Sequence, residues 1–293
     1  MVDQFLRYLT YEKRYSPHTL VAYEDDLDQL FDFIKETFEI SEPKEIRHMH
    51  LRSWVVSMID AGISPRSVNR RIACLKSYFK FLQVREYLTK NPASRLKPLK
   101  TDKKLPTFVR EGEMIKLLDQ VEFSDDFEGK RDKLLIELFY STGIRLAELI
   151  SLREKDINFY DSSIKVLGKR NKERVIPIPD SIVKYVKEFL SLKKDMWVAK
   201  SDDILFTTDK GRPLYPMLVY RVIKKYLGAV TTLSKKSPHV LRHTFATHLL
   251  DKGADLNAVK DLLGHTSLAA TQVYTHNSLE KLKSAFDQAH PKA

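Results

Sequence analysis

Apolar residues recur at helical spacing along the first hundred residues of the chain. In the segment 64–84 they follow one another at intervals of four, three, four and three residues, and they are Val68, Ile72, Leu75, Phe79 and Leu82. This spacing gathers the side chains on one face of a helix. Ser64 and Pro65 are residue types favoured at the N-cap and at the first helical position. The pattern therefore predicts a helix that buries one face.

A segment with the same organisation precedes it. Ser16 and Pro17 again predict a helix start, and the apolar positions that follow are Leu20, Leu27, Leu30 and Ile34. Helical patterns of this kind fill residues 1–97, and we expect them to form a domain of four to five helices. The single cysteine, Cys74, lies on the apolar side of its helix, so we expect it to be buried.

The polar stretch "KPLKTDKKLP" (97–106), bounded by prolines, interrupts the helical pattern. It predicts a linker at 98–106 and a second domain at 107–293. In that domain, residues 162–179 alternate β-branched and polar residues on each side of a polar turn, which predicts a β-hairpin, and helical patterns surround it. The expected fold is therefore mostly α with two domains, of which the C-terminal one is mixed α+β with a small antiparallel sheet.

Charge is spread unevenly along the chain, whose net charge is +11. Residues 21–48 hold nine acidic and three basic side chains, a net −6, whereas residues 65–104 hold twelve basic and two acidic side chains, a net +10. A solvated surface without a partner tends to mix the two signs. The segregation indicates that one face is turned toward a polyanion such as nucleic acid.

Helix 64–84 carries a candidate DNA-binding face opposite its apolar stripe. At about 100° per residue this face collects four basic side chains around the small residues Ala73 and Ser77, and they are Arg66, Arg70, Lys76 and Lys80. Small side chains at its centre let the helix backbone approach phosphates closely. An ordinary solvated helix face is the alternative interpretation of the same pattern.

Several classes of protein are not expected. We find no signal peptide and no apolar run near 18 residues, so we expect no membrane association. One cysteine excludes an internal disulfide and fits a cytoplasmic protein. We find no acidic cluster for Mg²⁺ and no glycine-rich loop for ATP, and a zinc site at His239 and His243 lacks further ligands. We therefore expect no cofactor.

The C-terminal segment carries residue types suited to phosphodiester chemistry. Such chemistry needs a nucleophile, positive charge on the non-bridging oxygens and an acid for the leaving oxygen. Tyr274 is a candidate nucleophile, and Arg242 can grip two phosphate oxygens with its planar guanidinium. His239 lies one helical turn before Arg242, and His265 follows Gly264, a residue type that commonly ends a helix.

A second arginine and a proton donor come from earlier in the domain. Arg145 follows Gly143, and Glu148 stands one helical turn further on, where it can fix the guanidinium. Lys169 lies near the tip of the predicted hairpin and suits a proton donor. Each residue has a plainer interpretation: a packed tyrosine, an ordinary ion pair or a solvated turn lysine. The ordered set is more informative than its members.

This ordered set resembles that of the tyrosine recombinases, also called the phage-integrase family. The resemblance rests on "TGIRLAEL", "GKRNKER", "SPHVLRHTFATHLL" and "LLGHTSLAATQVYTH", and on "YSPHTLVAYEDDLDQL", which resembles the N-terminal, SAM-like core-binding domain of that family. Arg170 departs from the glycine usual after the hairpin lysine. The compact length and the ending "AHPKA" are most similar to the Xer type, in which paired recombinases resolve chromosome dimers at cell division.

The resemblance implies a mechanism and an assembly. Tyr274 attacks a phosphate of a double-stranded DNA recombination site and forms a 3′-phosphotyrosyl bond, while Arg145, Arg242 and His265 stabilise the phosphate. Lys169 protonates the leaving 5′-oxygen and His239 takes the tyrosine proton. The implied partners are a second recombinase, identical or paralogous, in a tetramer, and a cell-division DNA translocase. A C-terminal helix at 278–290 docks into a neighbour, or packs on its own domain.

Other functions remain open from the sequence. An integrase or transposase of a mobile genetic element uses the same chemistry on another site. A relative of type IB topoisomerases that nicks and reseals without exchange is a further alternative, as is a DNA-binding protein that has lost activity. The complete set of six catalytic residue types argues against loss of activity.

Overall fold

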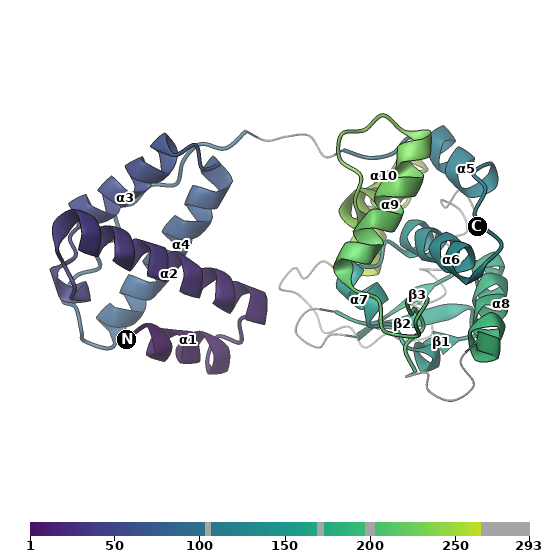
Figure 1. Cartoon of the computed structure of the whole chain (residues 1–293), viewed down its shortest axis with the longest axis horizontal. Helices are drawn as coiled ribbons and strands as arrows, with labels where there is room; N and C mark the ends of the chain where they lie inside the picture. The colour runs from purple at the N-terminus through teal and green to yellow at the C-terminus, as the bar shows by residue number, and fades with distance from the viewer. Residues whose placement is uncertain (103–106, 169–172, 197–202, 265–293) are drawn as a thin grey trace. The chain divides into compact units, whose positions relative to one another are not determined.

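The computed structural model describes residues 1–102, 107–168, 173–196 and 203–264, and it divides the chain into two compact units, Met1–Lys104 and Leu105–Ala293 (Figure 1). The described residues are mostly helical and include one small antiparallel sheet. The expected fold class is confirmed. None of the described helices is long and apolar enough to cross a membrane.

The described part of the N-terminal unit consists of four α-helices and one short 3₁₀ helix. These elements are α1 (Val2–Tyr11), α2 (Pro17–Phe38), η1 (Pro43–Glu45), α3 (His48–Asp60) and α4 (Pro65–Val84). Helix α2 packs against α1, α3 and α4 (Figure 1). The helix starts at Ser16 and Ser64 are as predicted, and all five residues of the predicted α4 stripe are buried.

Helix α4 is buried more widely than one stripe. Cys74, Tyr78 and Phe81 form a second buried row at intervals of four and three residues, because Phe5 of α1 packs its ring 5.3 Å from that of Tyr78 and 5.5 Å from that of Phe81. Burial raises the pKa of the Cys74 thiol. The solvent-facing part of α4 is therefore narrower than the sequence pattern indicates.

A buried carboxylate joins α2 to α4. Asp26 of α2 is 1% exposed and accepts hydrogen bonds from Nη1 and Nη2 of Arg70. The guanidinium of Arg71 lies beside the same carboxylate, with Nε 3.3 Å from Oδ1, and rests over the ring of Trp54 of α3. One side chain of α2 thus holds two arginines of α4 and connects three helices.

The C-terminal unit is built around α6. Its described helices are α5 (Glu111–Asp119), α6 (Phe127–Thr142), α7 (Leu146–Ile150), η2 (Glu154–Asp156), α8 (Asp180–Met196), α9 (Pro216–Val230), α10 (Pro238–Asp251) and α11 (Leu256–Leu263). Every residue from 134 to 142 is buried, and α6 packs against both α8 and α10. A helix buried on all sides forms the centre of a domain core.

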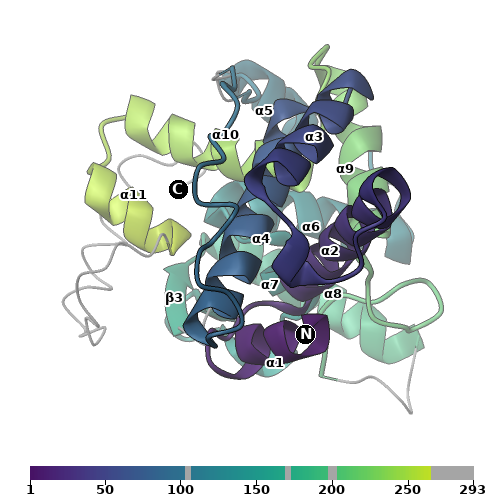
Figure 2. The ribbon, with the colours of Figure 1, turned by 90° about the vertical axis from the view of Figure 1, so that its left-hand side faces the viewer.

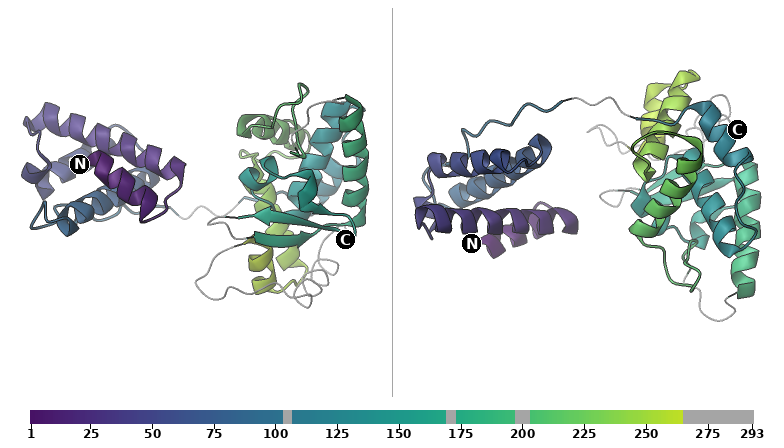
Figure 3. Two further views of the ribbon diagram at one scale, coloured as in Figure 1. Left: turned by 90° about the horizontal axis from the view of Figure 1, so that it is seen from below. Right: turned by 45° about the horizontal axis from the view of Figure 1, so that its top comes forward.

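A small sheet lies beside these helices (Figure 3). Its strands are β1 (Ile157–Asn158), β2 (Ser163–Leu167) and β3 (Glu173–Pro177), in the order β1-β2-β3 and antiparallel throughout. The hairpin β2–β3 was predicted from the sequence, whereas β1 was not. Ile164 pairs with Ile176 and Val166 with Arg174, so an arginine shares the buried face with three aliphatic residues.

Helix α11 packs on both α10 and β3 (Figure 2). It begins at Asp255, whose side chain accepts hydrogen bonds from the backbone N–H groups of Asn257 and Ala258. It ends at Gly264, which adopts the left-handed conformation with φ +61°, as the sequence predicted for a helix end. The C-terminus of α11 is thereby brought to the edge of the sheet and to the start of α7.

Candidate active site

Three arginines gather at the C-terminus of α11. Nε of Arg174 donates to the carbonyl oxygen of Leu262 at 2.9 Å. Nη2 of Arg242 donates to that of Leu263 at 2.5 Å, and Nη2 of Arg145 donates to that of Gly264 at 2.8 Å. The last carbonyls of a helix have no partner within the helix and carry its negative dipole end. Three consecutive carbonyls therefore orient three cations that come from α10, β3 and the start of α7.

Gly143 joins α6 to this cluster. It ends α6 with φ +57°, and a Cβ at this position would lie 2.4 Å from Cδ1 of Phe245 and 2.9 Å from Cδ2 of Leu263. Its carbonyl oxygen accepts a second hydrogen bond from Arg242, through Nη1. Glycine is required here both for the backbone conformation and for space. Arg145 follows two residues later, so the conformation of this turn fixes the position of the Arg145 backbone.

Glu148 fixes two of the three arginines. Its Oε1 accepts from Nη1 of Arg145 at 2.9 Å and from Nη1 of Arg174 at 2.8 Å, and its Oε2 accepts from the backbone N–H of Arg145 at 2.9 Å and from Nη2 of Arg174 at 2.8 Å. All four lone-pair positions of the carboxylate are in use. Burial alone would raise the pKa of Glu148, but Arg174 and Arg145 outweigh it and lower the pKa to about 2.

The cluster carries excess positive charge. Three guanidiniums, those of Arg145, Arg174 and Arg242, stand against one carboxylate, that of Glu148, so the four groups sum to +2. Burial, and after it the charges of Arg145 and Arg174, lower the pKa of Arg242 to about 10. Arg145 is also 32% exposed, so an anion from solvent can reach it. The arrangement is suited to bind a group with negatively charged oxygens.

The structure brings some of the predicted catalytic residues together. Arg145, Glu148 and Arg242 meet in this cluster, and the ion pair predicted from the three-residue spacing of Arg145 and Glu148 is present. His239 lies on α10 one turn before Arg242 and is exposed. Lys169, His265 and Tyr274 lie outside the described residues, as do Arg170 and the expected helix 278–290.

Sequence reasoning missed Arg174. A signal for it exists in β3, where alternation places residue 174 on the same face as Ile176. A charged residue on the buried face of a strand needs a buried partner of opposite charge. That requirement would have linked Arg174 to a carboxylate such as Glu148, which lies 26 residues earlier in the chain.

The structure shows how exposed the four basic residues of the predicted DNA-binding face of α4 are. Arg66 and Lys80 are exposed, as is Ala73 between them, and Lys76 is half-buried. Arg70 points to Asp26 of α2 and also donates to the carbonyl oxygen of Ala22 at 3.1 Å. Arg66 and Lys80 therefore present their charges to solvent more freely than Arg70 does.

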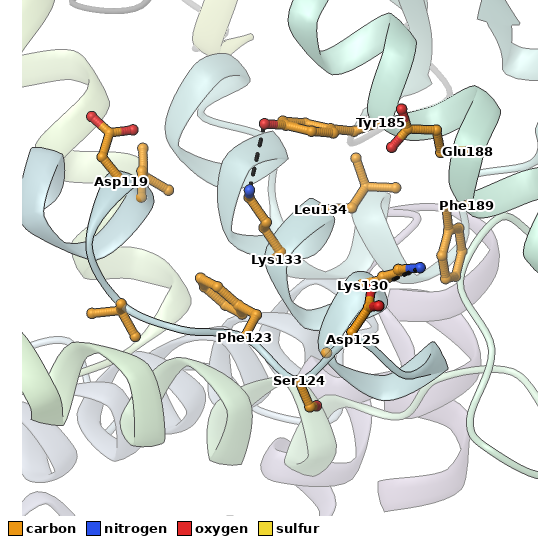
Figure 4. Close-up of a pocket in the computed structure, with 13 residues that line it drawn as sticks. Asp119, Phe123, Ser124, Asp125, Lys130, Lys133, Leu134, Tyr185, Glu188 and Phe189 are labelled. Carbon is orange, nitrogen blue, oxygen red and sulfur yellow. Dashed lines mark hydrogen bonds and ion pairs between the residues drawn. The ribbon is translucent and has the colours of Figure 1, made fainter.

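A cavity of about 270 Å³ lies elsewhere in the C-terminal unit, between the α5–α6 connection, α6 and α8 (Figure 4). Phe123, Leu134 and Phe189 line it, and Nζ of Lys133 lies 3.4 Å from the hydroxyl of Tyr185 at its side. None of the arginines of the cluster lines this cavity. Among the described residues, no three His, Cys, Asp or Glu side chains are grouped to hold a metal ion.

Comparison with known proteins defines the class of protein. The model described as "Phage integrase family" matches residues 107–281, and that described as "Phage integrase, N-terminal SAM-like domain" matches residues 2–86. The chain belongs to the phage integrase family and is a site-specific recombinase of the tyrosine type. The resemblance seen in the sequence motifs is confirmed.

Its relatives are of the Xer type. The tyrosine recombinase XerC of Chlorobaculum parvum is 36% identical, over 100% of this chain and 94% of that protein. XerD of Staphylococcus haemolyticus is 35% identical, over 100% of this chain and 99% of that protein. Among solved structures, XerH bound to palindromic difH substrate in a post-cleavage complex has a TM-score of 0.74 and 25% identity, covering 97% of this chain and 84% of that chain. The Tn1549 transposon integrase, at 20% identity and a TM-score of 0.72, shares the fold.

Proposed function

We propose that this protein cuts and rejoins double-stranded DNA at a specific site through a 3′-phosphotyrosyl intermediate. The observation that carries the proposal is the cluster of Arg145, Arg174 and Arg242 around a single carboxylate, with a net charge of +2. A phosphodiester gains negative charge on its non-bridging oxygens as the nucleophile attacks. Guanidiniums that are already oriented stabilise this charge without rearranging during the reaction.

Each catalytic residue has a role in the proposed reaction. The Tyr274 oxygen bonds to phosphorus and the bond to the 5′-oxygen breaks, while Arg145, Arg242 and His265 stabilise the phosphate oxygens. His239 takes the proton of Tyr274, and Lys169 gives a proton to the 5′-oxygen. Attack by a 5′-hydroxyl of a partner strand then reverses these steps and joins the strands. One phosphodiester replaces another, so the exchange needs no ATP.

We further propose that the protein acts as a tetramer with an identical or paralogous recombinase and resolves chromosome dimers. Similarity to XerC and XerD over the whole chain supports this role, and the Leu279, Leu282 and Phe286 stripe of residues 278–290 suits a helix donated to a neighbour. Integration of a mobile element is the second candidate, because the Tn1549 transposon integrase shares the fold.

The test begins by selecting a duplex from a random-sequence library by its binding to the full-length protein. The selected duplex is prepared with a nick at successive positions along each strand. A nick just beyond the scissile phosphate lets the short strand leave after cleavage, so the covalent adduct accumulates. We expect a protein–DNA adduct with the wild-type chain and none with Tyr274→Phe. An equal amount of adduct from both proteins would show that another residue is the nucleophile.

A second experiment separates the two biological roles. Two copies of the selected duplex are placed on one plasmid, and recombination is measured with this protein alone and with a paralogous Xer-type recombinase from the same genome. Chromosome dimer resolution predicts that the selected sequence occurs once in the host chromosome. Occurrence at the ends of a mobile element would favour the integrase role instead.

A further inference from the structure

Arg174 is held more firmly than the other two arginines of the cluster. Its side chain is 4% exposed, against 32% for Arg145. Its Nε, Nη1 and Nη2 all donate hydrogen bonds, to Leu262 and to both oxygens of Glu148. Its backbone is fixed in β3 by the pairing of residue 174 with Val166 of β2. A guanidinium with three nitrogens engaged and almost no exposure is poorly placed to bind DNA itself.

The contacts of Arg174 determine what Glu148 can do. Each oxygen of Glu148 accepts one bond from Arg174 and one from Arg145, so the carboxylate is shared evenly between the two residues. Arg145 consequently gives only Nη1 of its guanidinium to Glu148, and Nη2 to Gly264. A carboxylate with free lone pairs would instead take a second bond from the Arg145 guanidinium, since bidentate pairing is the favoured geometry.

We propose that Arg174 is a positioning residue for the cleavage reaction: by occupying one side of both Glu148 oxygens, it holds the Arg145 guanidinium toward the DNA phosphate. The inference rests on the proposed role of Arg145 as a phosphate ligand. Arg174 also donates to Leu262, next to the carbonyls that hold Arg242 and Arg145. It thereby ties the β2–β3 hairpin to the helix end that precedes His265.

The main variant is Arg174→Met, which keeps much of the side-chain volume and removes the charge and the donors. We expect the dissociation constant for the intact selected duplex to change less than about threefold. The single-turnover rate of adduct formation on the nicked duplex should fall about 10- to 100-fold, because a displacement of about 1 Å at a reacting group has an effect of this size. A wild-type rate in the folded variant overturns the inference.

Two further variants separate positioning from general loss of structure. In Arg174→Met/Glu148→Gln the carboxylate that would draw the Arg145 guanidinium into a bidentate pair is replaced by a neutral amide, so we expect at least about a fivefold recovery of the rate over Arg174→Met. If the rate does not recover, Glu148 does not draw Arg145 away from the phosphate, and the proposal is contradicted. Arg174→Lys is the test variant if Arg174→Met does not fold. A compact ammonium cannot reproduce the two parallel bonds to Glu148 together with the bond to Leu262, so the rate should fall at least tenfold, and a wild-type rate again overturns the inference.

Arg131→Met is the matched control. Arg131 is also a buried arginine of the C-terminal unit, and its Nε and Nη2 donate to Asp132 at 2.9 and 2.7 Å. It lies eleven residues before the end of α6 at Thr142, about 16 Å along the helix axis. We expect a comparable loss of melting temperature and an unchanged adduct rate. A rate loss equal to that of Arg174→Met would assign both effects to stability and overturn the inference.

The outcome for Arg174 is distinguishable from failure of the proposed function. If the wild type forms no adduct, or if Arg145→Ala forms it at the wild-type rate, the assigned function of the cluster is wrong. If the wild type is active, Arg145→Ala is inactive and Arg174→Met is as fast as the wild type, only the positioning role is wrong.

Discussion

Each unit of the molecule has a cluster in which one buried carboxylate pairs with two arginines, and the two clusters use their arginines differently. In the N-terminal unit, Arg70 and Arg71 both lie against Asp26, and two positive charges face one negative charge. In the C-terminal unit Glu148 faces three guanidiniums, and Arg242 is oriented by the carbonyl oxygens of Gly143 and Leu263. A carbonyl oxygen orients a guanidinium without cancelling its charge, whereas a carboxylate does both. The two clusters therefore differ in net charge, which is +1 for Asp26 with its two arginines and +2 for Glu148 with three, and the larger excess marks the anion site.

The largest effect on folding is expected at Asp26. Asp26→Ala leaves Arg70 and the more deeply buried Arg71 without their counter-charge, and it should lower the free energy of unfolding by about 2–3 kcal/mol. Urea denaturation followed by circular dichroism measures this change. Asp25→Ala, which removes an exposed carboxylate from the same helix, is the control and should change stability by less than about 0.5 kcal/mol. An equal loss of unfolding free energy in both variants would mean that the ion pairs of Asp26 do not stabilise the fold.

The largest effect on chemistry is expected at Arg145. Arg145→Ala removes one oriented positive charge from the site, and the rate of adduct formation should fall by about 10²–10³. Arg71→Ala is the control from the other cluster and should leave the rate unchanged at a temperature where the protein is folded. If the rate of adduct formation falls equally in both variants, the assignment of the C-terminal cluster and not the N-terminal one to the phosphate is wrong.

Acid should weaken the C-terminal cluster through Glu148. The pKa of Glu148 is about 2 in the folded protein and 4.5 ordinarily, so its carboxylate contributes fully above about pH 5. That contribution, up to roughly 3 kcal/mol, is lost as the pH falls from about 5 to 2. Urea midpoints measured between pH 7 and pH 3 check this. Glu148→Gln should show a shallower decline in this window, and an equally steep decline would contradict the assignment.

A smaller effect distinguishes the exposed basic residues of α4 from the paired one. Arg66→Ala and Lys80→Ala should each reduce the slope of log affinity against log salt by about one, as expected for the loss of one phosphate contact. Arg70→Ala should reduce it less, because Asp26 already pairs with that guanidinium. Binding of the selected duplex at several salt concentrations gives the slopes. A larger change for Arg70 than for Arg66 would place the DNA on the α2 side of α4.

Local patterns predicted the elements well. The stripe of α4, the helix start at Ser64, the β2–β3 hairpin and the helix end at Gly264 depend on residues close together in the chain, and the structure confirms them. The ion pair of Arg145 with Glu148 spans one helical turn and was predicted for the same reason. Spacing along one element is information that a single sequence carries.

Side-chain contacts between segments far apart in the chain could not be predicted from the sequence. Arg70 was placed on the solvent-facing side of α4, but its partner Asp26 lies 44 residues earlier on another helix. Arg174 meets Glu148 across 26 residues and Leu262 across 88. A helical projection gives the direction of a side chain and not what packs against it. The sequence therefore missed Arg174, and it placed Arg70 on the exposed face of α4 without showing that Asp26 is its partner.

The burial of Cys74 has a practical consequence for spectroscopy. The only thiol of the chain is buried on α4 with its Sγ 3.6 Å from the carbonyl oxygen of Tyr23 of α2, and its raised pKa keeps it protonated and unreactive. A maleimide dye will therefore react with a cysteine introduced at a surface position and leave Cys74 untouched. One such position in each unit, for example Asp60 and Lys210, would carry a dye pair whose separation can be measured with and without a DNA duplex.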